Sequence, residues 1–247
     1  MVRHTYRALI AYDGGAFHGF AKQPVVPTVE DALLRALRTC LPSLPAIQVG
    51  GRTDRGVHAV GQVISFYGPE RVEPRQLMEA INQEAPEVLM AREVHEVPRR
   101  FHAQYSASGR HYVYLLKDEG VLSVQTLDAM LFELVGTRCF TAMARKTDPD
   151  KSTVRQLRVA RARRVLTEGT PVIRFDFEAN SFLRSQVRVM VATAVREASA
   201  GASPTRLREL TELADRRLTA HPAPAEGLHL VHVRYAAPNW THEQTPL

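Results

Sequence analysis

The sequence predicts an α+β fold built from two ferredoxin-like (RRM-like) βαββαβ halves, whose mostly antiparallel sheets join, with an active-site cleft between them. Two observations lead to this fold class. Strand-like and helix-like segments follow one another in the order βαββαβ, and the same order occurs twice along the chain. The length of 247 residues suits two small domains or one large domain. We place the halves at residues 1–105 and 106–247.

The first half is identified by its alternating and helical patterns. Residues 5–12 alternate like a strand and end at Asp13-Gly14-Gly15, a sequence typical of a turn. Thr28 suits the N-cap of a helix, and Pro74 suits the first turn of a second helix. The strands of this half are expected over residues 5–12, 47–49, 62–67 and 88–97.

The second half repeats this order and adds one helix. An amphipathic helix is expected over residues 123–135, and Ser181 is expected to cap a long helix that ends near Ala200. Ser203-Pro204 begins the additional helix. The strands of this half are expected over residues 109–117, 154–166, 171–179 and 228–235.

The charge of the chain indicates a polyanionic partner. The formal net charge is +6 and the isoelectric point is about 9.6. The basic side chains are 28 arginines and four lysines. Arginine suits phosphate and stacks on bases, although codon bias would produce the same excess over lysine. The basic balance itself therefore favours nucleic acid as the partner.

Several classes of protein and site are excluded. Two widely separated cysteines, Cys40 and Cys139, rule out a disulfide framework and fit a cytoplasmic protein. No apolar run approaches the roughly 18 residues of a membrane span. The ten histidines show no metal-ligand spacing, so no metal site is expected. Of these, His58 and His102 are expected to orient a loop or contact RNA.

The segment GGRTDRGVHA, residues 50–59, concentrates chemistry-bearing residues. Its three glycines allow sharp turns and close approach to a ligand. Asp54 stands between Arg52 and Arg55, and positive neighbours favour a charged carboxylate, which suits a nucleophile or base. From spacing alone, a glycine-rich turn with solvated ion pairs explains the segment equally well.

This segment resembles the G-R-T-D-x-G-V-H-A signature of the TruA family of tRNA pseudouridine synthases. Four further motifs of that family have counterparts in the same order: YDGGAFHGF at 12–20, FHA with RHYVY at 101–103 and 110–114, SFL with VR at 181–183 and 187–188, and APAEGL at 223–228. The sequence departs from the family where Phe20 replaces a tryptophan, Cys139 an acidic residue and Val189 an asparagine.

The resemblance implies a homodimer that isomerises uridine to pseudouridine at positions 38, 39 and 40 of tRNA, without cofactor or metal. The site residues that it implies are Asp54 as the catalytic carboxylate, Arg52, Tyr112 and Arg188 as active-site support, and Arg52, Arg55, His58 and Tyr112 as contacts to RNA. Whether Asp54 attacks covalently or abstracts a proton stays open.

Two alternatives come from other classes of protein. A non-catalytic RRM-like module would bind RNA with the same fold, but the aromatic run typical of such modules is absent from the sequence. Passive binding also needs no aspartate at the centre of a glycine loop. A glycosidase usually needs two carboxylates that flank the bond, which makes this the weaker alternative.

Overall fold

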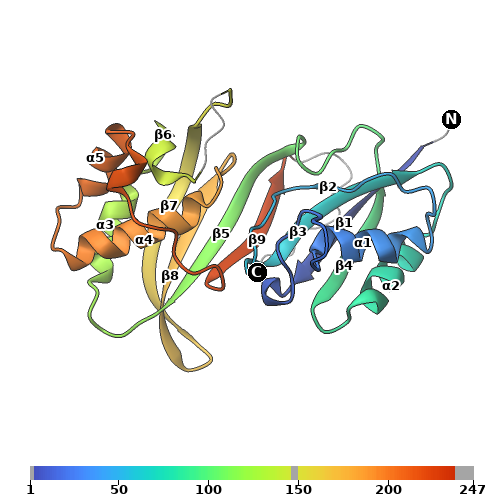
Figure 1. Cartoon of the computed structure of the whole chain (residues 1–247), viewed down its shortest axis with the longest axis horizontal. Helices are drawn as coiled ribbons and strands as arrows, with labels where there is room; N and C mark the ends of the chain where they lie inside the picture. Colours follow the sequence, from blue (N-terminus) through green and yellow to red (C-terminus); the bar gives the residue numbers. More distant parts are fainter. Residues whose placement is uncertain (1–2, 146–149, 237–247) are drawn as a thin grey trace. The chain divides into compact units, whose positions relative to one another are not determined.

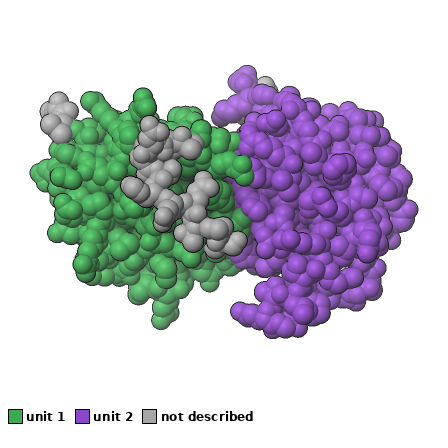
Figure 2. Space-filling view, turned by 180° about the vertical axis from the view of Figure 1, so that it is seen from behind, with its two compact units in different colours: residues 1–108, 230–247 green, residues 109–229 purple. Residues whose placement is uncertain are grey.

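The computed structural model describes residues 3–145 and 150–236, and these form two compact units (Figures 1 and 2). The first unit comprises residues 1–108 and 230–247, and the second comprises 109–229. The predicted halves placed the last strand, β9 (Leu228–Tyr235), in the second half. The structure groups most of it with the first unit, because β9 lies beside β3 (His58–Gly68) in the sheet.

The first unit is a sheet with the strand order β4-β1-β3-β9 and two helices. β1 pairs antiparallel with both β3 and β4, and the short β2 pairs antiparallel with β3. The elements not yet bounded are β1 (His4–Tyr12), the 3-10 turn η1 (Gly14–Ala16), α1 (Val29–Arg38), β2 (Gln48–Val49), α2 (Pro74–Glu84) and β4 (Leu89–Val97).

One face of this sheet forms the core of the unit. Tyr6, Ala8 and Ile10 alternate along β1 and are fully buried, as a period of two residues requires. The predicted helix starts are confirmed: the Thr28 hydroxyl accepts a hydrogen bond from the Asp31 amide at 3.3 Å, and Pro74 occupies the first turn of α2.

The described residues of the second unit include strands in the order β5-β8-β7-β6, with neighbouring strands antiparallel. β7 and β8 form a hairpin whose two-residue turn, Glu168-Gly169, has positive φ at both positions, as in a type I′ turn. The elements are β5 (Ala107–Lys117), α3 (Val124–Phe132), β6 (Gly136–Cys139), η2 (Thr141–Met143), β7 (Val154–Thr167), β8 (Thr170–Ala179), α4 (Gln186–Ser199), α5 (Arg206–Glu212) and η3 (Arg216–Leu218).

The mixed α+β class with antiparallel strand pairs is confirmed, but two details of the second half are not as predicted. Ser181 does not cap α4, which begins at Gln186. The Gln186 carboxamide accepts from the Leu183 amide at 2.8 Å, and Ser185 has a φ of 55°, so residues 181–185 form a turn before the helix. β6 was not expected, because its four residues lack apolar alternation.

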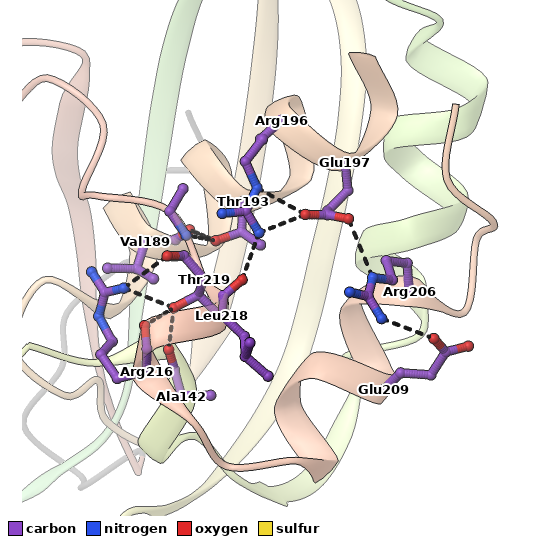
Figure 3. Close-up of polar contacts among 11 residues, drawn as sticks. Ala142, Val189, Thr193, Arg196, Glu197, Arg206, Glu209, Arg216, Leu218 and Thr219 are labelled. Atoms are coloured by element: carbon purple, nitrogen blue, oxygen red, sulfur yellow. Dashed lines mark hydrogen bonds and ion pairs between the residues drawn. The ribbon is translucent and has the colours of Figure 1, made fainter. Parts of the chain in front are cut away.

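A set of polar contacts ties η3 to α4 within the second unit (Figure 3). The Arg196 guanidinium donates to the Leu218 carbonyl at 2.6 Å. The Thr219 hydroxyl donates to the Ala142 carbonyl at 2.6 Å, and the Thr193 hydroxyl accepts from the Ala220 amide. These bonds fix the chain that leads to the APAEGL motif.

Within the described parts of the chain, no helix combines the length and apolar character needed to cross a membrane.

Asp176 on β8 lies at the centre of a cluster of ion pairs in this unit. Its side chain is 13% exposed and accepts hydrogen bonds from His111 at 3.0 Å and from Arg174 at 2.8 Å. Burial alone would raise the pKa of Asp176. The hydrogen bonds and charges of His111 and Arg174 outweigh burial and hold this pKa well below its usual value.

We predict that Asp176→Asn lowers the free energy of unfolding at pH 7 by about 1–3 kcal/mol, because Arg174 and Arg163 lose their anionic partner and His111 loses a charged acceptor. Since the folded pKa is depressed, the stability that the carboxylate contributes is full above roughly pH 4 and is lost as the pH falls through the folded pKa. Urea unfolding should show a smaller difference between variant and wild type at pH 3 than at pH 7.

The control is Glu212→Gln, which removes a carboxylate 61% exposed in the same unit and should cost less than about 0.5 kcal/mol. An Asp176→Asn effect that is unchanged or larger at pH 3 would contradict the prediction.

Candidate functional site

The GGRTDRGVHA segment forms a loop between β2 and β3 in the first unit. Arg52 and Arg55 are exposed, Asp54 is half-buried between them, and Thr53 is buried with 7% of its surface exposed. The Val57 amide donates to the Asp54 carbonyl at 3.2 Å, and Gly56 turns the chain with a φ of 78°. The loop therefore carries a half-buried aspartate with an exposed arginine on each side of it in the sequence.

A network of buried hydrogen bonds to residues of β1 and β3 holds this loop in place. The Tyr12 hydroxyl lies 2.8 Å from the Thr53 hydroxyl, and the Gln62 amide group donates to the Tyr12 oxygen at 3.3 Å. The same Gln62 carboxamide donates to the Gly51 carbonyl at 2.6 Å and accepts from the Gly51 amide at 3.2 Å. Residues of β1 and β3 thus fix the backbone on both sides of Arg52.

The phenol of Tyr12 stays neutral in this network. Burial raises the pKa of Tyr12 to about 12, against the smaller lowering effect of its hydrogen bonds with Thr53 and Gln62. Its role is therefore that of a neutral hydrogen-bonding group. Neither Tyr12 nor Gln62 was predicted as part of this network; the only signal for Gln62 was a polar residue in an apolar strand.

Glycines let two neighbouring segments approach the loop closely. A Cβ on Gly14 would lie 2.1 Å from the Val57 carbonyl oxygen. Gly19 has a φ of 95°, and the next amide, that of Phe20, donates to the Thr53 carbonyl at 3.1 Å. Only glycine permits this contact at Gly14, so the loop is braced by backbone as well as by side chains.

His58 lies at the end of the loop and contacts the turn after β1. Its Nδ1 is 3.2 Å from the Gly14 amide nitrogen and 3.1 Å from a carboxylate oxygen of Asp13. An unprotonated Nδ1 accepts from Gly14, and a protonated one donates to Asp13, so each state of the ring has a partner in the turn. The structure thus gives His58 an orienting contact to this turn.

Tyr112 and Arg188 belong to the second unit. Tyr112 is buried on β5, with its ring edge-on to Phe182 at a centroid distance of 5.3 Å. The Arg188 Nε donates to the Ala223 carbonyl at 2.6 Å, and the Ala223 amide donates to the Arg188 carbonyl at 3.1 Å. Arg188 is therefore tied to the APAEGL motif from both its backbone and its side chain.

Tyr114, two residues after Tyr112 on the same face of β5, is a second group near Arg188. Burial and the charge of Glu226 raise the pKa of Tyr114 to about 12, and the charge of Arg188 opposes this shift. A Cβ on Gly227 would lie 2.6 Å from the Tyr114 ring. The glycine of the APAEGL motif is thus required by the packing of Tyr114.

The three departures from the family pattern fit their surroundings. Phe20 is 1% exposed and its ring lies 6.4 Å from that of Tyr12, so a phenylalanine fills the core position. Val189 is fully buried on α4. Cys139 is exposed at the end of β6, with its sulfur 3.2 Å from the Thr141 hydroxyl. None of these residues disturbs the anchors of the Asp54 loop.

The structure places Arg52, Asp54 and Arg55 on one loop and His58 at the start of β3, and it places Tyr112 and Arg188 on β5 and α4 of the second unit. Among residues 3–145 and 150–236, no group of three histidine, cysteine, aspartate or glutamate side chains is arranged to hold a metal ion.

The family model and the related sequences that match this chain indicate the same family. The sequence model of a family described as tRNA pseudouridine synthase matches residues 8–106 and 130–236. A tRNA pseudouridine synthase A from Lacticaseibacillus casei is 33% identical over 246 residues, which cover 93% of this chain and 99% of the relative. One from Caulobacter vibrioides is 34% identical over 249 residues, which cover 93% of this chain and 98% of the relative.

Similarity to solved structures is weaker. A Cbf5-Nop10-Gar1 complex matches with 14% identity and a TM-score of 0.34, over 74% of this chain and 43% of that chain. At this level the comparison carries no argument about the fold.

We predict that Gly14→Ala displaces the Asp54 loop, because the added Cβ meets the Val57 carbonyl and neither backbone can move without breaking other contacts. The expected cost is about 2–4 kcal/mol in the free energy of unfolding, with faster amide hydrogen exchange over residues 51–58. The control is Gly15→Ala, whose Cβ would meet only the Asp13 side chain at 3.1 Å. Equal effects of the two substitutions would refute the backbone contact as the cause.

Proposed function

The chain belongs to the tRNA pseudouridine synthase family, and from this premise we propose that Asp54 is the carboxylate that carries the reaction. The protein isomerises uridine to pseudouridine in tRNA, so it is an isomerase rather than a non-catalytic RNA-binding module. The reaction breaks the N1–C1′ bond, turns the uracil and joins C5 to C1′; the C5 proton leaves to solvent and N1 takes up a proton, so the atoms balance. It involves no net oxidation, and the proposal includes no cofactor.

The observation that carries the assignment to Asp54 is the anchoring of its loop. A carboxylate that acts at the ribose must be held in place before the substrate arrives, because misplacement by about 1 Å is costly for catalysis. Thr53, directly before Asp54, is fixed by the buried Tyr12 hydroxyl, and the turn after Asp54 is closed by the Val57 amide. Asp54 itself is half-buried rather than enclosed in the core.

The neighbours of Asp54 suit an RNA ligand. A stacked uridine cannot present its glycosidic bond to a side chain, so the target nucleotide must leave the helix. Arg52 and Arg55 are exposed on either side of Asp54, where planar guanidinium groups can bind the phosphates of the extruded nucleotide. We assign Arg52, Arg55 and His58 to contacts with the RNA.

Further parts of the proposal rest on the family resemblance. Tyr112 and Arg188 support the reaction, and Tyr112 also contacts the substrate base. The target uridines are those at positions 38, 39 and 40, in the anticodon stem-loop. The protein works as a homodimer in the cytoplasm, and its two units are of the ferredoxin-like class.

We predict that Asp54→Asn abolishes pseudouridine formation while tRNA affinity changes less than about threefold, because the amide keeps the shape of the carboxylate but cannot act as nucleophile or base. Tritium release from tRNA labelled at C5 of uridine measures turnover, and fluorescence anisotropy measures affinity. Asp31→Asn, on α1, is the control and should leave turnover unchanged. Near-normal turnover by a folded Asp54→Asn protein would disprove the assignment.

Binding of tRNA should also depend strongly on salt, because the chain carries a net charge of +6 and exposes Arg52 and Arg55 beside the site. We expect log affinity to fall with log salt concentration with a slope steeper than about −3, which corresponds to three or more phosphate contacts. Arg52→Ala should make this slope shallower by roughly one contact, whereas Arg75→Ala, on the exposed side of α2, should not. A nearly flat salt response would show that the positive charge is incidental.

A further inference from the structure

We propose that Tyr105, whose ring lies against that of His102 on a segment that also carries Arg99 and Arg100, is a stacking site for an unpaired base of the RNA substrate. The site lies on the segment between β4 and β5, apart in sequence from the Asp54 loop. The inference rests on the proposed function only in taking RNA as the ligand.

Tyr105 is unusual among the aromatic residues of the chain in its exposure. Its side chain is 80% exposed, although Phe101 and Ala103 in the same segment are 7% and 0% exposed. Tyrosine offers a large apolar ring with few rotatable bonds, and burying such a ring on binding is favourable. A ring exposed to solvent in this way can stack against a planar group such as a base.

The segment that presents Tyr105 is fixed by its buried residues. The Phe101 ring lies 5.1 Å from that of Tyr235, and the Tyr235 hydroxyl donates to the Ala103 carbonyl at 2.7 Å. The Ala103 amide donates to the Ser65 hydroxyl at 2.9 Å. Because these anchors belong to β3 and β9, the segment is held by the sheet of the first unit and does not need a ligand to order it.

A local turn sets the ring of His102 against that of Tyr105. The amides of Gln104 and Tyr105 both donate to the His102 Nδ1, at 3.1 and 3.3 Å, and the Ser106 amide donates to the His102 carbonyl at 2.9 Å. The ring centroids of His102 and Tyr105 are 4.4 Å apart, at an interplanar angle of 33°. A base that stacks on Tyr105 would extend an existing pair of rings.

The His102 ring is neutral near pH 7. Burial lowers the pKa of His102, against the smaller raising effect of its backbone hydrogen bond, and Nδ1 already acts as an acceptor. A neutral ring adds no charge to the platform, so stacking at this site is largely independent of salt.

The positive charge comes instead from Arg99 and Arg100. Both are exposed, and in the part of the chain that the structure describes neither forms an ion pair with a carboxylate. An exposed aromatic ring on a segment that also carries cationic side chains is a combination with which proteins hold single-stranded nucleic acid: bases stack on the ring, and phosphates meet the cations. Two exposed arginines on this segment, neither of them in an ion pair with a carboxylate among the described residues, favour a polyanion over a second protein chain.

The test compares Tyr105→Ala, Tyr105→Phe and Tyr105→Trp with wild type in tRNA binding by fluorescence anisotropy. Tyr105→Ala should weaken binding roughly 5- to 100-fold, the range for loss of one stacked base, and should leave the slope of log affinity against log salt unchanged. Tyr105→Phe and Tyr105→Trp keep a ring and should stay within about threefold of wild type. Phe132→Ala, which removes an aromatic ring 60% exposed on α3, is the matched control and should have no effect.

A second measurement locates the base. Single 2-aminopurine substitutions in the loop of an anticodon stem-loop RNA should include one position whose fluorescence is quenched on binding wild type but not on binding Tyr105→Ala. Unchanged affinity of Tyr105→Ala, equal loss in Tyr105→Phe, or a change in the sedimentation of Tyr105→Ala that reveals a contact between two copies of the chain would each overturn the inference. If wild type binds RNA with this quenching but forms no pseudouridine, the proposed function fails and the stacking site stands.

Discussion

The hydroxyl of Tyr12 is the point on which the candidate site depends. It connects β1 to the Asp54 loop through Thr53 and to β3 through Gln62, all within the buried side of one sheet. Buried polar groups are costly when they lose their partners, so each member of this network constrains the others. The position of the carboxylate is therefore set by the packing of the sheet and not by the loop alone.

Close backbone contacts add a second constraint of a different kind. Gly14 and Gly19 bring two turns against the loop where no other residue would fit or adopt the required φ. The side-chain hydrogen bonds set the orientation of the loop, whereas the close backbone contacts set its distance from the two neighbouring turns. Together they hold Asp54 in place while Arg52 and Arg55 stay exposed to solvent. A fixed carboxylate between exposed positive charges is the arrangement that the proposed role of Asp54 requires.

Much of the fold was predictable because it rests on local patterns. The alternation along β1, the Thr28 cap and Pro74 each appear in the structure as expected. The start of α4 was predicted wrongly because Ser181 resembles a cap, whereas residues 181–185 form a turn that the Gln186 side chain closes by accepting from the Leu183 amide. At the candidate site, the family resemblance singled out Asp54 and its neighbouring arginines, and their roles remain a prediction. The contacts of Tyr12 were not, because its partners are 41 and 50 residues distant.

The pairing of β9 with the first unit has a consequence for the synthesis of the chain. Residues 230–235 come from the C-terminal end, whereas the strand they cover, β3, is made early, and the backbone of Val231 passes where a Cβ on Gly61 would stand. Until residues 230–235 have left the ribosome, part of the β3 edge has open hydrogen-bonding groups. A chain terminated before residue 230 would thus carry an unsealed first unit, a form that chaperones and proteases recognise.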